Sequence, residues 1–137
     1  MLVLDTSVVV ASLSPGERHH EDCRLLVESA EEQIAIPGPT LCEIDYVVHA
    51  RLGALEMPKF LRRIRVGELG VAQLEIDDLD RTIELMERYA DLDVGFVDAS
   101  VLAIVERLNE PKLATLDRKH FGAMRPRHVE SLELLPA

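Results

Sequence analysis

The chain has 137 residues, the size of one ordinary domain, so we expect a single domain over residues 1–137. Its 47% apolar and 29% charged residues are typical of a folded globular protein and argue against disorder. No apolar run approaches the roughly 18 residues of a membrane span, and strand-like sequence begins at Met1 with no signal peptide before it. The sequence therefore predicts a cytoplasmic protein with no membrane partner.

The net charge of −10 argues against nucleic acid as a partner, because phosphate binding usually requires a basic surface. The distribution of the charge weakens this objection. Segments 51–65 and 112–128 each hold five lysines and arginines but only one acid, Glu56 and Asp117 respectively. Such runs are often plain solvated surface, yet two basic segments on an acidic body are also able to flank a binding site.

Strand-like and helix-like segments alternate along the chain. In chain order, hydrophobic periodicity and breaker residues predict a strand at 2–5, helices at 6–13 and 18–30, a strand at 33–36, helices from 40 and at 58–66, a strand at 71–76, helices at 77–89 and from 97, and strands at 112–116 and 132–135. This alternation is typical of a mostly parallel sheet with helices on both faces. The expected fold class is α/β, with a three-layer α/β/α architecture.

The two cysteines do not indicate a disulfide framework or a zinc site. Cys23 and Cys42 lie in helical patterns beside apolar residues, so we expect buried free thiols in a reducing compartment. No histidine pairs with a cysteine at the spacing of a zinc finger.

Three aspartates, Asp5, Asp98 and Asp117, interrupt apolar sequence at the ends of predicted elements. A carboxylate that is buried without a partner loses hydration at a cost of several kcal/mol, and Arg118 is the only lysine or arginine adjacent to any of the three. A divalent cation is the natural partner of several converging carboxylates. Because ligands of α/β sheets bind beyond the carboxyl ends of the strands, the sequence predicts a metal site there.

Each acid also has a simpler explanation. Aspartate is a preferred N-cap, so Asp5 and Asp98 would only cap the helices that follow them, and Asp117 would only end its strand in a turn. Thr40-Leu41-Cys42-Glu43 matches a capping box, in which Glu43 reaches back to the start of its own helix. The apolar flanks favour a functional role for Asp5, whereas from the residues alone capping is the better explanation of Glu43.

Hydroxyl side chains accompany two of the acids. Thr6 and Ser7 follow Asp5, where they would hold its carboxylate, touch a substrate phosphate or cap the helix. Thr115 points to the same side of its strand as Asp117, because strand side chains alternate, and would orient that carboxylate or the attacking water. Asp93 lies in a polar loop and is expected to be an outer residue of the site at most.

With four acids in this order, the chain resembles the PIN-domain ribonucleases, and specifically the VapC-type toxins of bacterial toxin–antitoxin pairs, over essentially its whole length. The first and last matching segments are fairly specific when taken together. The matching segments are Leu2-Val3-Leu4-Asp5-Thr6-Ser7, Glu43 in the helix after Pro39, Val97-Asp98-Ala99-Ser100, and Ala114-Thr115-Leu116-Asp117-Arg118-Lys119-His120-Phe121. All four acidic positions are filled, as expected of an active member.

The resemblance implies a Mg²⁺- or Mn²⁺-dependent endoribonuclease that hydrolyses RNA phosphodiesters to 5′-phosphate and 3′-hydroxyl ends. Asp5 and Asp98 would bind the first ion. Glu43 and Asp117 would complete the ligand shell directly or through water, or hold a second ion. Arg118 and the basic segments would bind flanking phosphates.

The resemblance also implies a homodimer that is silenced by a cognate VapB-type antitoxin. An arginine or lysine of the antitoxin would enter the cluster of carboxylates. Apolar antitoxin side chains would dock against the helices at 18–30 and 40–66, at residues such as Leu26, Val48 and Leu52.

Two other interpretations stay open at this point. A phosphatase of the haloacid dehalogenase type also begins with a strand-terminal aspartate, but it needs a second aspartate two residues later, where this chain has Ser7. A non-catalytic α/β binding module, whose acids only cap helices, would bind Mg²⁺ or Mn²⁺ no better than any other acidic protein.

Overall fold

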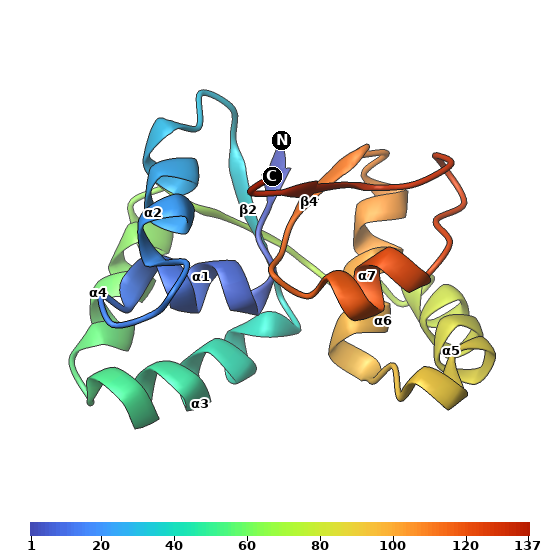
Figure 1. The fold of residues 1–137 in the computed structure, drawn as a ribbon, viewed down its shortest axis with the longest axis horizontal. Helices are drawn as coiled ribbons and strands as arrows, with labels where there is room; N and C mark the ends of the chain where they lie inside the picture. The colour runs from blue at the N-terminus through green and yellow to red at the C-terminus, as the bar shows by residue number, and fades with distance from the viewer.

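A computed structural model describes all residues from 1 to 137, and it shows strands and helices alternating along the chain (Figure 1). The strands are β1 (Leu2–Val3), β2 (Ile34–Pro37), β3 (Gly70–Ala72), β4 (Lys112–Ala114) and β5 (Glu133–Leu135). The helices are α1 (Thr6–Leu13), α2 (His20–Ser29), α3 (Thr40–Leu52), α4 (Glu56–Arg65), α5 (Asp78–Arg88), the 3₁₀ turn η1 (Ala90–Leu92), α6 (Phe96–Arg107) and α7 (Arg118–Ala123). None of these helices has the length and apolar character that a bilayer crossing requires.

All strand pairs are parallel, and β1 lies at the centre of the sheet. β1 pairs with β2 and β2 with β3, while β4 pairs with β5. Leu4, directly after β1, forms a parallel bridge with Ala114 at the end of β4, which joins the two sections in the order β3-β2-β1-β4-β5. The chain therefore moves from β1 toward one edge and later returns to the other side of β1. The switch point, where such sheets bind ligands, lies between β1 and β4.

Alternation of side chains along the central strands divides the core into two halves. Leu2 and Leu4 pack with α1–α4, whereas Val3 between them packs with α5–α7. Strand β2 is divided in the same way, since Ile34 and Ile36 belong to the first half and Ala35 to the second. In Figure 1 the two groups of helices lie on opposite sides of the strands. This arrangement confirms the predicted three-layer α/β/α architecture.

The strands are shorter than the sequence predicts. β3 ends at Ala72 rather than Ile76, because the chain turns there toward α5. The Asp78 carboxylate accepts a hydrogen bond from the Glu75 amide (2.9 Å) and pairs with Arg107 (3.1 Å), which holds this segment out of the sheet. β4 likewise ends before Thr115, whose side chain is used in the site described below.

Helix α6 carries the longest unbroken run of buried residues of any helix, and it fixes the position of one of the predicted acids. Every residue from Ala99 to Val105 is buried. The helix begins at Phe96 after the N-cap Gly95, so Asp98 lies inside the first turn and is not the cap. A carboxylate in the first turn is favoured by the helix dipole. Tight packing of α6 therefore sets the position of this acid.

Both cysteines are free, but only one is buried. Cys23 belongs to the core beneath α1, as expected. Cys42 is exposed, so the expectation of a buried thiol is wrong there. Helix α3 turns Ile44 and Val48 toward the core, which leaves position 42 facing solvent.

Candidate functional site

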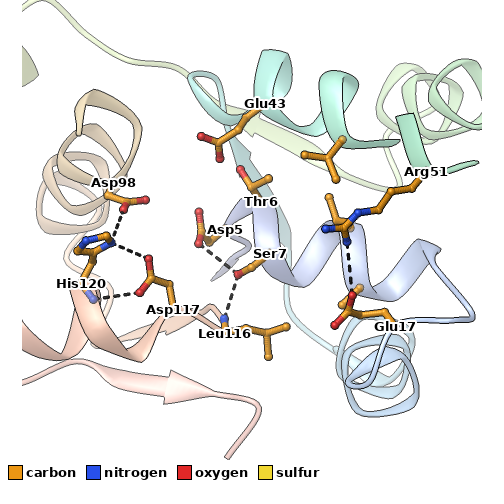
Figure 2. A pocket seen from close by; sticks show the side chains of 13 residues that line it. Asp5, Thr6, Ser7, Glu17, Glu43, Arg51, Asp98, Leu116, Asp117 and His120 are labelled. Carbon is orange, nitrogen blue, oxygen red and sulfur yellow. Dashed lines mark hydrogen bonds and ion pairs between the residues drawn. The ribbon is translucent and has the colours of Figure 1, made fainter. Parts of the chain in front are cut away.

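A cleft of about 440 Å³ lies beyond the carboxyl ends of β1 and β4, at the switch point of the sheet. All four predicted acids are among the 13 residues that line it (Figure 2). They come from remote segments: Asp5 from the end of β1, Glu43 from the first turn of α3, Asp98 from the first turn of α6 and Asp117 from the N-cap of α7. The fold thus brings four carboxylates to one concave surface.

Asp5 lies at the bottom of the cleft and is only 4% exposed. Its Oδ2 accepts hydrogen bonds from Thr115 Oγ1 (2.9 Å) and Ser7 Oγ (3.3 Å), while its Oδ1 is buried without a hydrogen-bond partner. Although Asp5 is the N-cap residue of α1, its side chain makes no capping bond. Burial raises its pKa to about 6, the bond from Thr115 opposes this shift, and the Asp98 charge adds to it. The capping explanation therefore fails for Asp5, which presents one free oxygen.

The hydroxyls of Ser7 and Thr115 join the two strand ends. Besides donating to Asp5, Thr115 Oγ1 accepts from the Asp117 amide (3.0 Å), and Ser7 Oγ accepts from the Leu116 amide (3.0 Å). Thr115 therefore orients the carboxylate of Asp5, and it contacts Asp117 through the backbone rather than through its carboxylate. Each hydroxyl donates a hydrogen bond to Asp5 and accepts one from a backbone amide, and these bonds hold the start of α1 against the segment after β4.

His120 lies between Asp98 and Asp117 at the mouth of the cleft (Figure 2). Its Nδ1 is 2.8 Å from Asp117 Oδ2 and 3.1 Å from Asp98 Oδ2, and its Nε2 is 3.0 Å from the Leu92 carbonyl oxygen. Both ring nitrogens face acceptors, an arrangement that the protonated imidazolium satisfies. The hydrogen bond to Asp117 is the main cause that raises the pKa of His120. His120 is therefore the only histidine, lysine or arginine that contacts the carboxylate cluster.

No site role was predicted for His120 from the sequence, although its spacing from Asp117 indicates one. His120 follows Asp117 by three residues in a short helix, and residues at this spacing share one face. The Asp117 side chain also caps α7 by accepting from the His120 amide (3.0 Å), so its capping role and its place in the cleft coexist. This cap turns the side chains of Asp117 and His120 to the same surface, the wall of the cleft.

Asp98 and Asp117 are less buried than their apolar flanks predict. Their side chains are 22% and 30% exposed, because both stand at the rim of the cleft rather than at its bottom. Partial burial still raises the pKa of Asp98, and the Asp117 charge raises it further, while His120 lowers it. Of the three aspartates, only Asp5 is buried as expected.

Glu43 does not form the predicted capping box. The Thr40 hydroxyl donates to the Pro37 carbonyl oxygen (2.7 Å), and no side chain caps the first turn of α3. Glu43 is instead exposed and lines the cleft, with its carboxylate near Thr6 in Figure 2. The choice favoured by local sequence was therefore wrong for this residue.

Of the two other residues predicted to contact substrate, Thr6 lies in the cleft and Arg118 does not. Thr6 lines the cleft, and its hydroxyl is buried without a partner. Arg118 is exposed and is not part of the cleft, because its guanidinium donates to the Pro136 carbonyl oxygen (2.7 Å). Asp93 does not line the cleft either.

The far end of the cleft holds two charged residues for which no individual role was predicted from the sequence. Arg51 and Glu17 form an ion pair there (3.4 Å), away from His120 and Asp98 (Figure 2). Arg51 is the only lysine or arginine that lines the cleft. Arg51 is therefore the only permanently charged cation in the same cleft as the four acids.

Comparison with known proteins agrees with this architecture. Ribonuclease VapC26 of Mycobacterium tuberculosis is 26% identical over 125 residues, which cover 91% of this chain and 93% of that protein. The crystal structure of M. tuberculosis VapC20, described as a sarcin-ricin loop cleaving toxin, superposes with a TM-score of 0.79 at 20% identity, covering 95% of this chain and 99% of the other. VapBC2 from Rickettsia felis, bound to a promoter DNA fragment, gives a TM-score of 0.64 at 18% identity and covers 97% of this chain and 96% of the other.

These likenesses extend over the strands and helices that build the cleft. The PIN domain family matches residues 2–125, which include all four acids and His120. The matched segment also contains strands β1 to β4 and the switch point of the sheet, and the chain belongs to the PIN domain family.

Proposed function

We propose that this protein is a VapC-type toxin, a metal-dependent endoribonuclease that hydrolyses RNA phosphodiesters in the cytoplasm, with residues 1–137 as one PIN domain. The observation that carries the proposal is the convergence of Asp5, Glu43, Asp98 and Asp117 in one cleft. Membership of the PIN family and the names of the similar proteins, a ribonuclease and a toxin, support it. The same observations disfavour a phosphatase of the haloacid dehalogenase type, since Ser7 takes the place of its second aspartate and serves to hold Asp5.

The donor set fits Mg²⁺ or Mn²⁺. Asp5 presents a buried oxygen without a partner, and carboxylate oxygens of Asp98 and Asp117 lie within 4.8 Å of each other. Carboxylate oxygens are the ligands that these hard cations prefer. We propose that Asp5 and Asp98 hold the ion, with Glu43 and Asp117 as direct or water-mediated ligands. When bound, such an ion supplies Lewis-acid stabilisation of the phosphate and lowers the pKa of water.

The remaining side chains of the cleft orient groups and bind substrate. Thr115 and Ser7 hold the carboxylate of Asp5 in one orientation, which leaves its second oxygen toward the cleft. We propose that the free hydroxyl of Thr6 donates a hydrogen bond to a substrate phosphate oxygen. We assign no substrate contact to Arg118, because its guanidinium is bound to the end of the chain outside the cleft.

Cleavage of RNA with added metal tests the proposal directly. Purified protein should cleave structured RNA with Mg²⁺ or Mn²⁺, should stop when a chelator is added, and should leave 5′-phosphate ends that end labelling can identify. Protein that binds these ions no better than an unrelated acidic protein, and leaves all RNA intact, would instead be the non-catalytic binding module.

Replacement of His120 by alanine should weaken metal binding more than it changes the fold. His120 orients Asp98 and Asp117 through Nδ1, and loss of such an orienting partner typically costs about 10- to 100-fold in metal affinity or activity. The Mn²⁺ concentration for half-maximal cleavage should rise accordingly, as measured by metal titration. The variant His49→Ala is the control, because His49 is exposed on α3 and does not line the cleft. Equal metal titration curves for both variants would remove His120 from the site.

We also propose a homodimer and a VapB-type antitoxin, since closed two-fold assembly is common and the structures of similar proteins include VapBC complexes. The helices α2–α4 carry exposed apolar residues, among them Leu25, Tyr46 and Leu61, that an antitoxin would cover. Val48 is not among them: it is fully buried, so the predicted docking at this residue is wrong. Leu26 and Leu52 are half-buried against the core.

Co-expression with a small gene directly upstream should yield a complex that no longer cleaves RNA, with a mass by light scattering that corresponds to two toxin chains plus the bound antitoxin. An antitoxin arginine that enters the cluster of carboxylates should be essential to it. Truncation of a buried, paired charge at an interface costs about 2–5 kcal/mol, so its replacement by alanine should weaken the complex about thirtyfold or more. An inhibited complex that is insensitive to every antitoxin arginine and lysine would contradict this mode of inhibition.

A further inference from the structure

Helix α3 presents a row of three residues to the cleft. Glu43, Val47 and Arg51 are spaced by four residues, so they share one face of the helix, and all three line the cleft. Eight residues of α-helix rise about 12 Å along the axis. The row therefore begins at the carboxylate cluster and ends at a cation about two turns away.

Arg51 has unused hydrogen-bonding capacity. A guanidinium carries five N–H donors, but the one polar contact of Arg51 is a single Nη1–Oε2 distance of 3.4 Å to Glu17. Its side chain is 55% exposed, and an ion pair of this kind contributes at most about 1 kcal/mol to stability. Arg24 on α2 differs, because it pairs with both Glu21 and Glu28 at 2.5 Å. The contact of Arg51 with Glu17 thus contributes little to stability and is easily exchanged.

An RNA strand in this cleft requires a cation of this kind. Four of its carboxylates surround the proposed site of cleavage, and the protein carries a net charge of −10. Arginine matches the geometry of phosphate oxygens bidentately. At two helical turns from Glu43, Arg51 is too distant for the phosphate that is cleaved but is placed for its neighbour along the strand.

We propose that Arg51 binds an RNA phosphate adjacent to the cleaved one, and that Glu17 competes with this phosphate for the guanidinium. This inference rests on the proposed ribonuclease function and assigns the path of the strand: from His120 and Asp98 past Thr6 to Arg51 (Figure 2). The two members of the ion pair then have opposite effects. Arg51 strengthens RNA binding, whereas Glu17 weakens it.

The test measures binding of a fluorescein-labelled, single-stranded RNA of mixed sequence by anisotropy, in an Asp98→Asn background so that the RNA stays intact. Adding Arg51→Gln should raise Kd about tenfold, as for a lost charged hydrogen bond. The slope of log K against log salt should become shallower by about 0.7, the loss of one phosphate contact on a single strand. Adding Glu17→Gln should lower Kd about two- to fivefold, because the competing carboxylate is gone. Arg51→Lys should keep most of the salt slope.

Matched controls separate this effect from net charge and folding. Arg24→Gln and Glu21→Gln make the same charge changes on an ion pair outside the cleft and should leave Kd nearly unchanged. Thermal unfolding of all variants should agree closely, since these pairs are exposed. A shift of Kd in the same direction for Arg51→Gln and Glu17→Gln, or an unchanged salt slope for Arg51→Gln, would overturn the inference even if the wild-type protein cleaves RNA. Failure of the wild-type protein to cleave or bind any RNA would overturn the proposed function and this inference together.

Discussion

Asp98→Asn and Asp5→Asn should each abolish metal-dependent RNA cleavage while the protein stays folded. Each substitution keeps the shape of the side chain but removes the charge of a proposed metal ligand. Because a bound metal ion contributes several kcal/mol of charge stabilisation, we expect the rate to fall by about a hundred- to a thousandfold or more. The measurement is cleavage of labelled RNA with saturating Mn²⁺, together with circular dichroism to verify the fold.

The matched control for this loss is Asp93→Asn. Asp93 is five residues before Asp98 and is exposed outside the cleft. Its backbone is left-handed with φ of 55°, a conformation that asparagine also tolerates, so the same change of charge should not disturb the fold. Full activity is expected for this variant. Persistent cleavage by Asp98→Asn or Asp5→Asn, with contaminating nuclease excluded, would remove that residue from the mechanism.

The metal-free protein should become more stable when Asp5 is replaced by asparagine. Burial raises the pKa of Asp5 from 3.8 to about 6, so ionised Asp5 costs the folded state about 3 kcal/mol. Asparagine keeps a carbonyl oxygen for the hydrogen bond from Thr115 but carries no charge. At pH 8 we therefore expect Asp5→Asn to raise the free energy of unfolding by about 1–3 kcal/mol, in contrast to its loss of activity.

The stabilisation by Asp5→Asn should depend on pH. Between pH 3.8 and about 6, folded Asp5 holds a proton that the unfolded chain has released. The contribution of Asp5 to stability is therefore complete below pH 3.8 and is lost as the pH rises through 6. The advantage of Asp5→Asn should shrink from pH 8 to pH 5, as measured by urea unfolding with a chelator present.

Added Mg²⁺ should reverse the order of stability, because the ion binds the folded wild-type protein and compensates the charge of Asp5. An Asp5→Asn variant that is less stable than the wild type at both pH values without metal would show that Asp5 is satisfied by its protein neighbours. An equal difference at pH 5 and pH 8 would contradict the raised pKa.

Local patterns in the sequence were sufficient for the architecture. The alternation of Leu2, Val3 and Leu4 between two halves of the core, and the burial of residues 99–105, follow from periods of two and 3.6 residues that are written in the sequence. An aspartate at the end of an apolar strand also indicated the buried carboxylate of Asp5, because an unpaired charge there needs a functional reason. These features depend on residues that are neighbours along the chain.

Features that depend on how helices are rotated and joined were not accessible from local sequence. Thr40 to Glu43 has the sequence of a capping box, yet the chain entering α3 from β2 places the Thr40 hydroxyl on Pro37 and leaves Glu43 free for the cleft. His120 meets Asp98 only because α7 packs beside α6. Arg118 and Arg51 both lie in basic segments of the sequence. In the structure Arg118 binds the carbonyl oxygen of Pro136 near the end of the chain, whereas Arg51 lines the cleft.

The sequence by itself thus determined the layers, the order of the strands and helices along the chain, and the acids that stand at element ends, because periodicity and the cost of burying charge act locally. The tertiary structure decided which of those acids is buried, which histidine joins them and which arginine shares their cleft. Those outcomes depend on contacts between segments up to about a hundred residues apart, and no local pattern records the rotation of one helix against another.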